Sequence, residues 1–104
     1  MELDEALQEL KRELQALYGD RLKGLYLFGS HARGEAEPDS DVDVAVVLDD
    51  YDSVWEEIHR MSDIAARLSL EADVLLMETP FRSSEWEERA SLFLRSVRRD
   101  AEAV

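Results

Sequence analysis

The stretch that decides the fold covers residues 22–48 and reads LKGLYLFGSHARGEAEPDSDVDVAVVL. Its beginning, residues 22–28, is short, apolar and aromatic, which predicts a buried strand. In residues 41–48, large apolar side chains alternate with smaller or acidic ones, which predicts a second strand with two distinct faces. The polar residues 29–40 read as the loop that joins the strands and brings them together.

An amphipathic helix is predicted before this stretch and another after it. Leucines recur at steps of four and three over residues 3–17, and Gly19 follows as a natural end. Ser53 opens the second helix, with Glu56 placed to complete a capping box. We expect the core face of this second helix to consist of Val54, Ile58, Met61, Ala65 and Leu68.

The C-terminal third predicts one more strand and one more helix. Residues 72–77 are predicted to form the strand, which the Thr79–Pro80 dipeptide would end. A capping box of Ser84 and Glu87 would open the last helix, and residues 100–104 would fray. The apolar face of that helix would be formed by Trp86, Ala90, Phe93, Leu94 and Val97.

The resulting order is helix, strand, strand, helix, strand, helix. It predicts an α/β fold, a small mixed sheet backed by helices. With 104 residues the chain fits a single domain, residues 1–104, since domains typically hold about 100–150 residues.

Composition narrows the function classes. The net charge of −13, from 25 acidic and 12 basic residues, repels phosphate backbones and argues against nucleic-acid binding. Such a surface is either simply solvated or a docking face for a basic partner. The lack of cysteine excludes disulfides and thiolate metal sites. We expect no membrane association and a cytoplasmic location, because no signal peptide and no apolar run of about 20 residues is found.

Asp41 and Asp43 are the first candidate site. Two residues apart on a strand, they lie on one face with Cα atoms about 6.5–7 Å apart, so their carboxylates can converge on cations. An Asp-x-Asp pair alone is usually a pair of surface acids, but this one opens an otherwise apolar strand. Oxygen-only ligands suit Mg²⁺, which takes its remaining ligands from water and substrate phosphates.

Gly29 and Ser30 are the second candidate site. They directly follow a predicted buried strand, and residues 31–33 can form the first turn of a short helix. Backbone N–H groups of such a turn, with the Ser30 hydroxyl, can cradle phosphate, although Gly-Ser alone is usually an ordinary turn. A phosphate cradle beside an acidic pair is what two-metal nucleotidyl transfer requires.

Residues 29–43, GSHARGEAEPDSDVD, resemble the signature of the minimal nucleotidyltransferases (MNT) of the polymerase-β-like superfamily, which includes kanamycin nucleotidyltransferase. The resemblance implies nucleotide-phosphate contacts at Gly29 and Ser30, and metal ligands at Asp41 and Asp43. It gives Arg33 the role of bracing the acidic loop or touching phosphate. The implied cofactors are Mg²⁺, as two ions, with ATP as the nucleotide donor.

The superfamily usually has a third carboxylate on a later strand. Asp73 is the candidate for a third metal ligand or for the base that takes the acceptor's proton, and Glu71 is its competitor. His31 reads as a tolerated side chain and His59 as a structural one. The two tryptophans, at positions 55 and 86, read as core or interface residues.

The resemblance also implies a partner. Minimal nucleotidyltransferases are commonly paired with a small helical HEPN toxin, so we expect an antitoxin that transfers AMP to a hydroxyl side chain of such a toxin, in a hetero-oligomer. One alternative is an antitoxin that acts by binding alone. Another is a small-molecule enzyme of the aminoglycoside type, which the short chain disfavours because it leaves little room for an acceptor-binding domain.

Overall fold

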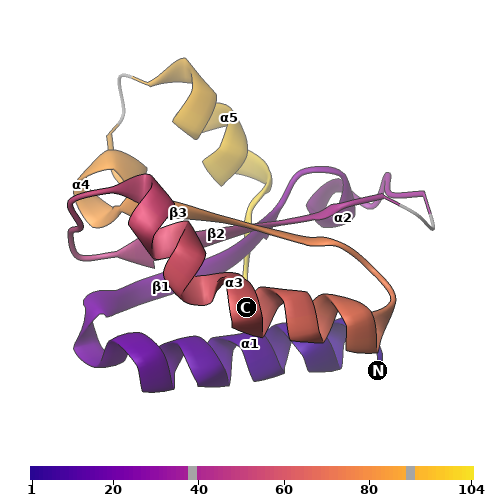
Figure 1. Ribbon diagram of the computed structural model, residues 1–104. Helices are drawn as coiled ribbons and strands as arrows, with labels where there is room; N and C mark the ends of the chain where they lie inside the picture. Colours follow the sequence, from indigo (N-terminus) through magenta and orange to yellow (C-terminus); the bar gives the residue numbers. More distant parts are fainter. Residues whose placement is uncertain (38–39, 89–90) are drawn as a thin grey trace.

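A four-stranded mixed sheet with helices on both faces forms the frame of the protein (Figure 1). The computed structural model describes residues 1–37, 40–88 and 91–104. The elements in chain order are α1 (Leu3–Tyr18), a 3-10 turn (Gly19–Arg21), β1 (Leu22–Phe28), α2 (Ser30–Arg33), β2 (Val42–Leu48), α3 (Val54–Ala72), β3 (Leu76–Arg82), α4 (Ser83–Trp86), α5 (Leu92–Asp100) and β4 (Glu102–Ala103).

The strand order, β3-β2-β1-β4, sets which chain ends meet. Strand β2 runs antiparallel to β1 and parallel to β3, with Phe28 opposite Asp43 and Val42 opposite Leu76. The end of β1 and the beginnings of β2 and β3 therefore lie at the same end of the sheet. This end of the sheet carries the Gly29 turn and the acidic pair.

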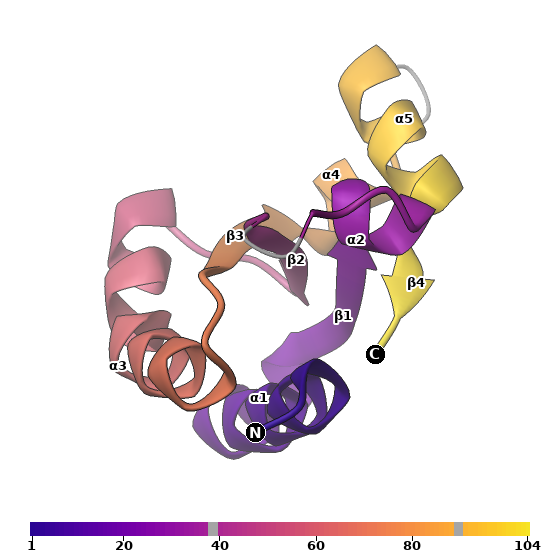
Figure 2. The same cartoon turned by 90° about the vertical axis from the view of Figure 1, so that its right-hand side faces the viewer.

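The central strand β2 has the two distinct faces that its alternating pattern predicts, and the structure buries both of them. Figure 2 shows α1 and α3 together on one face of the sheet and α4 and α5 on the other. Val42, Val44, Val46 and Leu48 belong to the core under α1 and α3, whereas Ala45 and Val47 belong to the core under α4 and α5. Each fully buried leucine of the larger core contributes about 1.5–3 kcal/mol.

Helix α3 begins as predicted. Ser53 is its N-cap, and the Ser53 hydroxyl accepts a hydrogen bond from the Glu56 N–H at 3.4 Å. The predicted core face is only partly confirmed: Met61, Ala65 and Leu68 are buried, Ile58 is half-buried and Val54 is exposed. The buried residue of the first turn is Glu57, which a pattern of apolar residues cannot reveal.

The predicted strand over residues 72–77 is wrong in its bounds. Helix α3 continues through Ala72, and Asp73 ends it in the left-handed conformation with φ 54°. Strand β3 starts at Leu76 and continues through the Thr79–Pro80 dipeptide that was expected to end it. Proline is tolerated there because β3 is an edge strand, where a missing N–H need not remove a ladder hydrogen bond.

The predicted last helix is also wrong, because two short helices take its place. The chain forms α4, with Arg82 rather than Ser84 at its N-cap, and then α5, capped by the Ser91 hydroxyl, which accepts from the Leu94 N–H at 3.2 Å. Trp86, Leu94 and Val97 are buried as expected, Phe93 is exposed, and Ala90 lies outside the described residues.

The C-terminal residues do not fray. Strand β4 pairs antiparallel with β1, with Ala103 opposite Tyr26, and the Lys11 ammonium donates to the Val104 carbonyl at 2.8 Å. Backbone pairing at a free sheet edge orders this tail, and local sequence gives no signal for it. Among the helices of the described residues, none combines the length and apolar character needed to span a bilayer.

Candidate active site

Gly29 makes the turn that leads from β1 into α2. Its backbone angles, φ 76° and ψ −154°, lie in a region that is essentially restricted to glycine. A Cβ atom at this position would lie 2.4 Å from Oδ2 of Asp43. The absence of a side chain at residue 29 therefore lets the turn pass directly against the Asp43 carboxylate.

Helix α2 is a single turn that is held at both ends. The Arg33 N–H donates to the Gly29 carbonyl at 3.2 Å, and the Glu35 N–H donates to the Ser30 carbonyl at 2.9 Å. Gly34 then ends the helix with φ 72° in the left-handed region. Ser30 occupies the first position of α2, beside Gly29, as the sequence predicts.

Asp41 and Asp43 lie at the start of β2. Asp41 is exposed just before the strand, and Asp43 is half-buried as its second residue. Burial raises the pKa of Asp43 above the ordinary aspartate value, and the nearby Asp41 carboxylate raises it further. The two carboxylates are therefore electrostatically coupled, and a hard cation between them would relieve their repulsion.

His31 and Arg33 lie near the acidic pair at this end of the sheet. Both lower the pKa of Asp43, in opposition to burial and Asp41. The imidazole Nε2 of His31 lies 3.2 Å from the Ser40 carbonyl oxygen, which ties α2 to the residue just before Asp41. Arg33 donates from Nε to Glu35 at 3.2 Å. The sequence pattern gave His31 no role, and its place in the first turn of α2 was the available signal.

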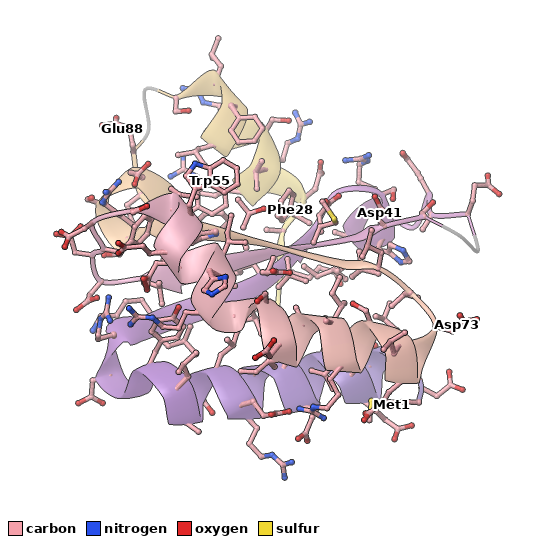
Figure 3. The ribbon with its side chains drawn as sticks, in the orientation of Figure 1. Met1, Phe28, Asp41, Trp55, Asp73 and Glu88 are labelled. Atoms are coloured by element: carbon pink, nitrogen blue, oxygen red, sulfur yellow. The ribbon has the colours of Figure 1, made fainter. Side chains whose placement is uncertain are left out.

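The structure does not bring Asp73 to the acidic pair. Asp73 caps α3 instead of lying on β3, and Figure 3 shows it at the turn after α3, well separated from Asp41. Its competitor Glu71 is paired with Arg67 at 3.6 Å. Within residues 1–37, 40–88 and 91–104, no three acidic or histidine side chains are grouped closely enough to hold a metal ion.

The two tryptophans and His59 differ in burial. Trp86 is buried and stacks on Tyr26, with ring centroids 4.9 Å apart, so it is a core residue as expected. Trp55 is exposed on the first turn of α3. His59, expected to be structural, is also exposed, because its position on α3 faces away from the sheet.

The chain is similar in sequence to known proteins. The sequence profile of the nucleotidyltransferase domain matches residues 7–99. The protein adenylyltransferase MntA of Thermococcus cleftensis is 37% identical over 82 residues, which cover 79% of this chain and 80% of that protein.

Solved structures share the fold. A toxin–antitoxin complex with AMP-PNP contains a chain that superposes with a TM-score of 0.61 at 21% identity, over 90% of this chain and 68% of that one. A complex of tri-AMPylated Shewanella oneidensis HEPN toxin with MNT antitoxin gives a TM-score of 0.52 at 20% identity, over 94% of this chain and 70% of that one. At these identities the similarity establishes the common fold.

Proposed function

The chain belongs to the nucleotidyltransferase domain family, and from this premise we propose that it is an antitoxin that transfers AMP from ATP to a hydroxyl side chain of a HEPN-type toxin. The observation that carries the proposal is the packing of the Gly29 turn against Asp43, next to Asp41. The name of the Thermococcus relative and the toxins in the structurally similar complexes support a protein as the acceptor.

The residues around Gly29 and the acidic pair fit Mg²⁺ and a nucleotide phosphate, the two groups that nucleotidyl transfer needs. Asp41 and Asp43 would hold Mg²⁺ through carboxylate oxygens, the ligands that this ion prefers. Bound Mg²⁺ would supply charge neutralisation on the attacking and leaving oxygens. Backbone N–H groups of the turn that Gly29 begins would bind a phosphate oxygen, the Ser30 hydroxyl would donate to it, and Arg33 would add positive charge or brace the loop.

The proposed reaction is an in-line displacement at the α-phosphorus of ATP. The acceptor oxygen forms the new bond to phosphorus, the bond to pyrophosphate breaks, and the acceptor proton passes to a carboxylate base. Asp73 remains our proposal for that base and third metal ligand. If residues 73–75 became extended, Asp73 would share a strand face with Leu75 and Met77, the residue opposite Asp43.

The test is a transfer assay with labelled ATP, Mg²⁺ and a helical HEPN-type protein as the candidate partner. We expect the intact mass of the partner to increase by one or more AMP units, and Asp41→Asn with Asp43→Asn to abolish the gain while the fold is retained. Full transfer by the double variant would show that the acidic pair is not the active site.

A second candidate is an antitoxin that neutralises its partner by binding alone. It is favoured by the position of Asp73, since the residues that the structure describes place no third carboxylate with the acidic pair. Under this alternative the partner would be neutralised with no change in its mass. Co-expression of toxin with wild-type protein and with the double variant separates the two candidates, because only the first requires the acidic pair.

A further inference from the structure

An apolar groove of about 930 Å³ runs along α3 beside the edge strand β3. Trp55 lies at one end of it, and Leu70, Leu75 and Met77 lie at the other. Between them α3 contributes small side chains to the floor of the groove: Ser62, Ala65, Ala66 and Ser69. The part of α3 from Trp55 to Leu70 is about 22 Å long, at 1.5 Å per residue, so the groove can accommodate several turns of a helix.

Large apolar side chains around this groove are left in solvent. Trp55 is 78% exposed and Leu70 is 84% exposed, and Leu75 and Met77 are also exposed. Figure 3 shows Trp55 projecting from the first turn of α3. A single exposed apolar residue is ordinary, whereas several that line one groove are typical of a protein–protein contact.

The outer edge of β3 is closed to an added strand. The Leu76 N–H donates to the Ser69 hydroxyl at 3.0 Å, and the Pro80 carbonyl accepts from the Tyr51 hydroxyl at 3.1 Å. Pro80 also has no N–H to offer. A segment in the groove must therefore bind through its side chains, as an amphipathic helix does, and not through a backbone ladder.

The charge of the groove is purely acidic. Asp73 and Glu78 are the charged residues among the described residues that line it, and these include no lysine or arginine. Glu78 is partly buried, burial raises its pKa, and no ion pair joins it to any of the residues that the structure describes. A positively charged side chain that enters the groove would form an ion pair with the Glu78 carboxylate.

The groove borders β3, the strand that pairs with β2 and its acidic pair. The Leu75 carbonyl accepts from the N–H of Val42, the residue between the two aspartates, at 2.8 Å. Met77 is opposite Asp43 in the parallel register. A segment held against Leu75 and Met77 therefore lies beside the acidic pair.

We propose that the α3–β3 groove docks an amphipathic, basic helix of the protein that the active site modifies. The apolar face of that helix packs on Trp55 and Leu70 across the small residues of α3, and a lysine or arginine pairs with Glu78. The helix thereby holds the acceptor hydroxyl near Asp41 and Asp43. This inference rests on the proposed function, because it identifies how a protein acceptor is held.

The test measures binding of the candidate HEPN-type partner, the one that the wild type binds or modifies, to three groove variants, Leu70→Glu, Trp55→Ala and Glu78→Gln. We expect Leu70→Glu to weaken the complex by about 100-fold or more, because it places a charge at one of the main apolar contacts of the proposed interface. Glu78→Gln should weaken it about tenfold and reduce its dependence on salt. MgATP affinity, measured by calorimetry, should be unchanged in all three variants.

Matched controls lie outside the groove. Leu17→Glu changes an exposed leucine of α1, and Glu56→Gln removes an exposed carboxylate from another side of α3. Both should bind and modify the partner as the wild type does. A benzophenone amino acid should cross-link to the partner from position 70 but not from position 17.

The possible outcomes separate the two proposals. Groove variants that bind and modify the partner like the wild type would overturn the groove proposal and leave the proposed function intact. A wild-type protein that binds the partner through the groove without adding AMP would overturn the transfer reaction alone. Conversion of a wild-type dimer to a monomer by Leu70→Glu, with partner binding unchanged, would assign the groove to self-association and overturn the proposal.

Discussion

Oδ2 of Asp43 occupies the space that a side chain on residue 29 would need, since a Cβ added to Gly29 would approach it to 2.4 Å. Gly29→Ala should therefore displace the Asp43 carboxylate and abolish AMP transfer. It should also lower the free energy of unfolding by about 1–3 kcal/mol, because alanine is strained at φ 76°. Urea unfolding and the transfer assay measure the two effects separately.

Gly34 provides the matched control for this prediction. It also has a positive φ, 72°, but a Cβ there would meet no atom of the described residues within 4 Å. Gly34→Ala should lose stability through backbone strain and keep most of its transfer activity. Equal loss of activity in both variants would mean that strain in the loop, and not contact with Asp43, explains the effect.

The raised pKa of Asp43 predicts a pH-dependent stability difference. Burial, followed by the Asp41 charge, raises this pKa in the folded state. The contribution of Asp43 to stability is therefore fully present below the pKa of an unfolded aspartate and is lost as the pH rises through the raised folded value. Asp43→Asn should be more stable than the wild type at pH 7.5 in EDTA, with a smaller difference at pH 4.

The control for the pH effect is Asp63→Asn, which removes a charge from an exposed position of α3. Thermal unfolding of this variant should follow the wild type across the same pH range. If Asp43→Asn is less stable than the wild type at neutral pH in EDTA, the Asp43 carboxylate makes a stabilising contact that our account lacks.

Asp73→Asn tests the proposed base. Asparagine tolerates the left-handed conformation found at residue 73, so the end of α3 should be preserved and the free energy of unfolding should change little. If Asp73 takes the acceptor proton, transfer should slow by about 10²–10⁴-fold while MgATP binding is kept. Single-turnover assays measure this rate, with Glu71→Gln as the control.

An unchanged rate in Asp73→Asn would leave Asp73 as a helix cap, which is the position that the structure gives it. A large loss of rate would instead require residues 73–75 to rearrange before transfer. Hydrogen exchange at these residues, with and without MgATP, would detect that change directly.

The two tryptophans should respond very differently to truncation. Trp86 is buried and stacked on Tyr26, so Trp86→Ala should cost about 3–5 kcal/mol of the free energy of unfolding. Trp55 is exposed, so Trp55→Ala should change it by less than about 0.5 kcal/mol. Similar large losses in both variants would contradict the surface position of Trp55, on which the groove proposal depends.

The sequence alone determined the two central strands and the turn between them. The short apolar and aromatic run predicts the limits of β1, and the alternation of large apolar residues with smaller or acidic ones predicts the two faces of β2. The sequence also predicted that Gly29, Asp41 and Asp43 lie near one another, because a short loop joins their strands and their residue types are distinctive.

Only the tertiary structure decided the features that depend on distant partners. Whether Asp73 lay on a strand depended on where α3 ends, and residues 70–75 contain no glycine or proline that would mark that end. Strand β3 can continue through Pro80 because β3 is an edge strand, which local sequence does not reveal. Residues 102–103 form a strand because they pair with β1. The groove beside α3 likewise arises from packing α3 against β3. Local sequence encodes which faces are apolar, but the assembled sheet determines which of them remain uncovered.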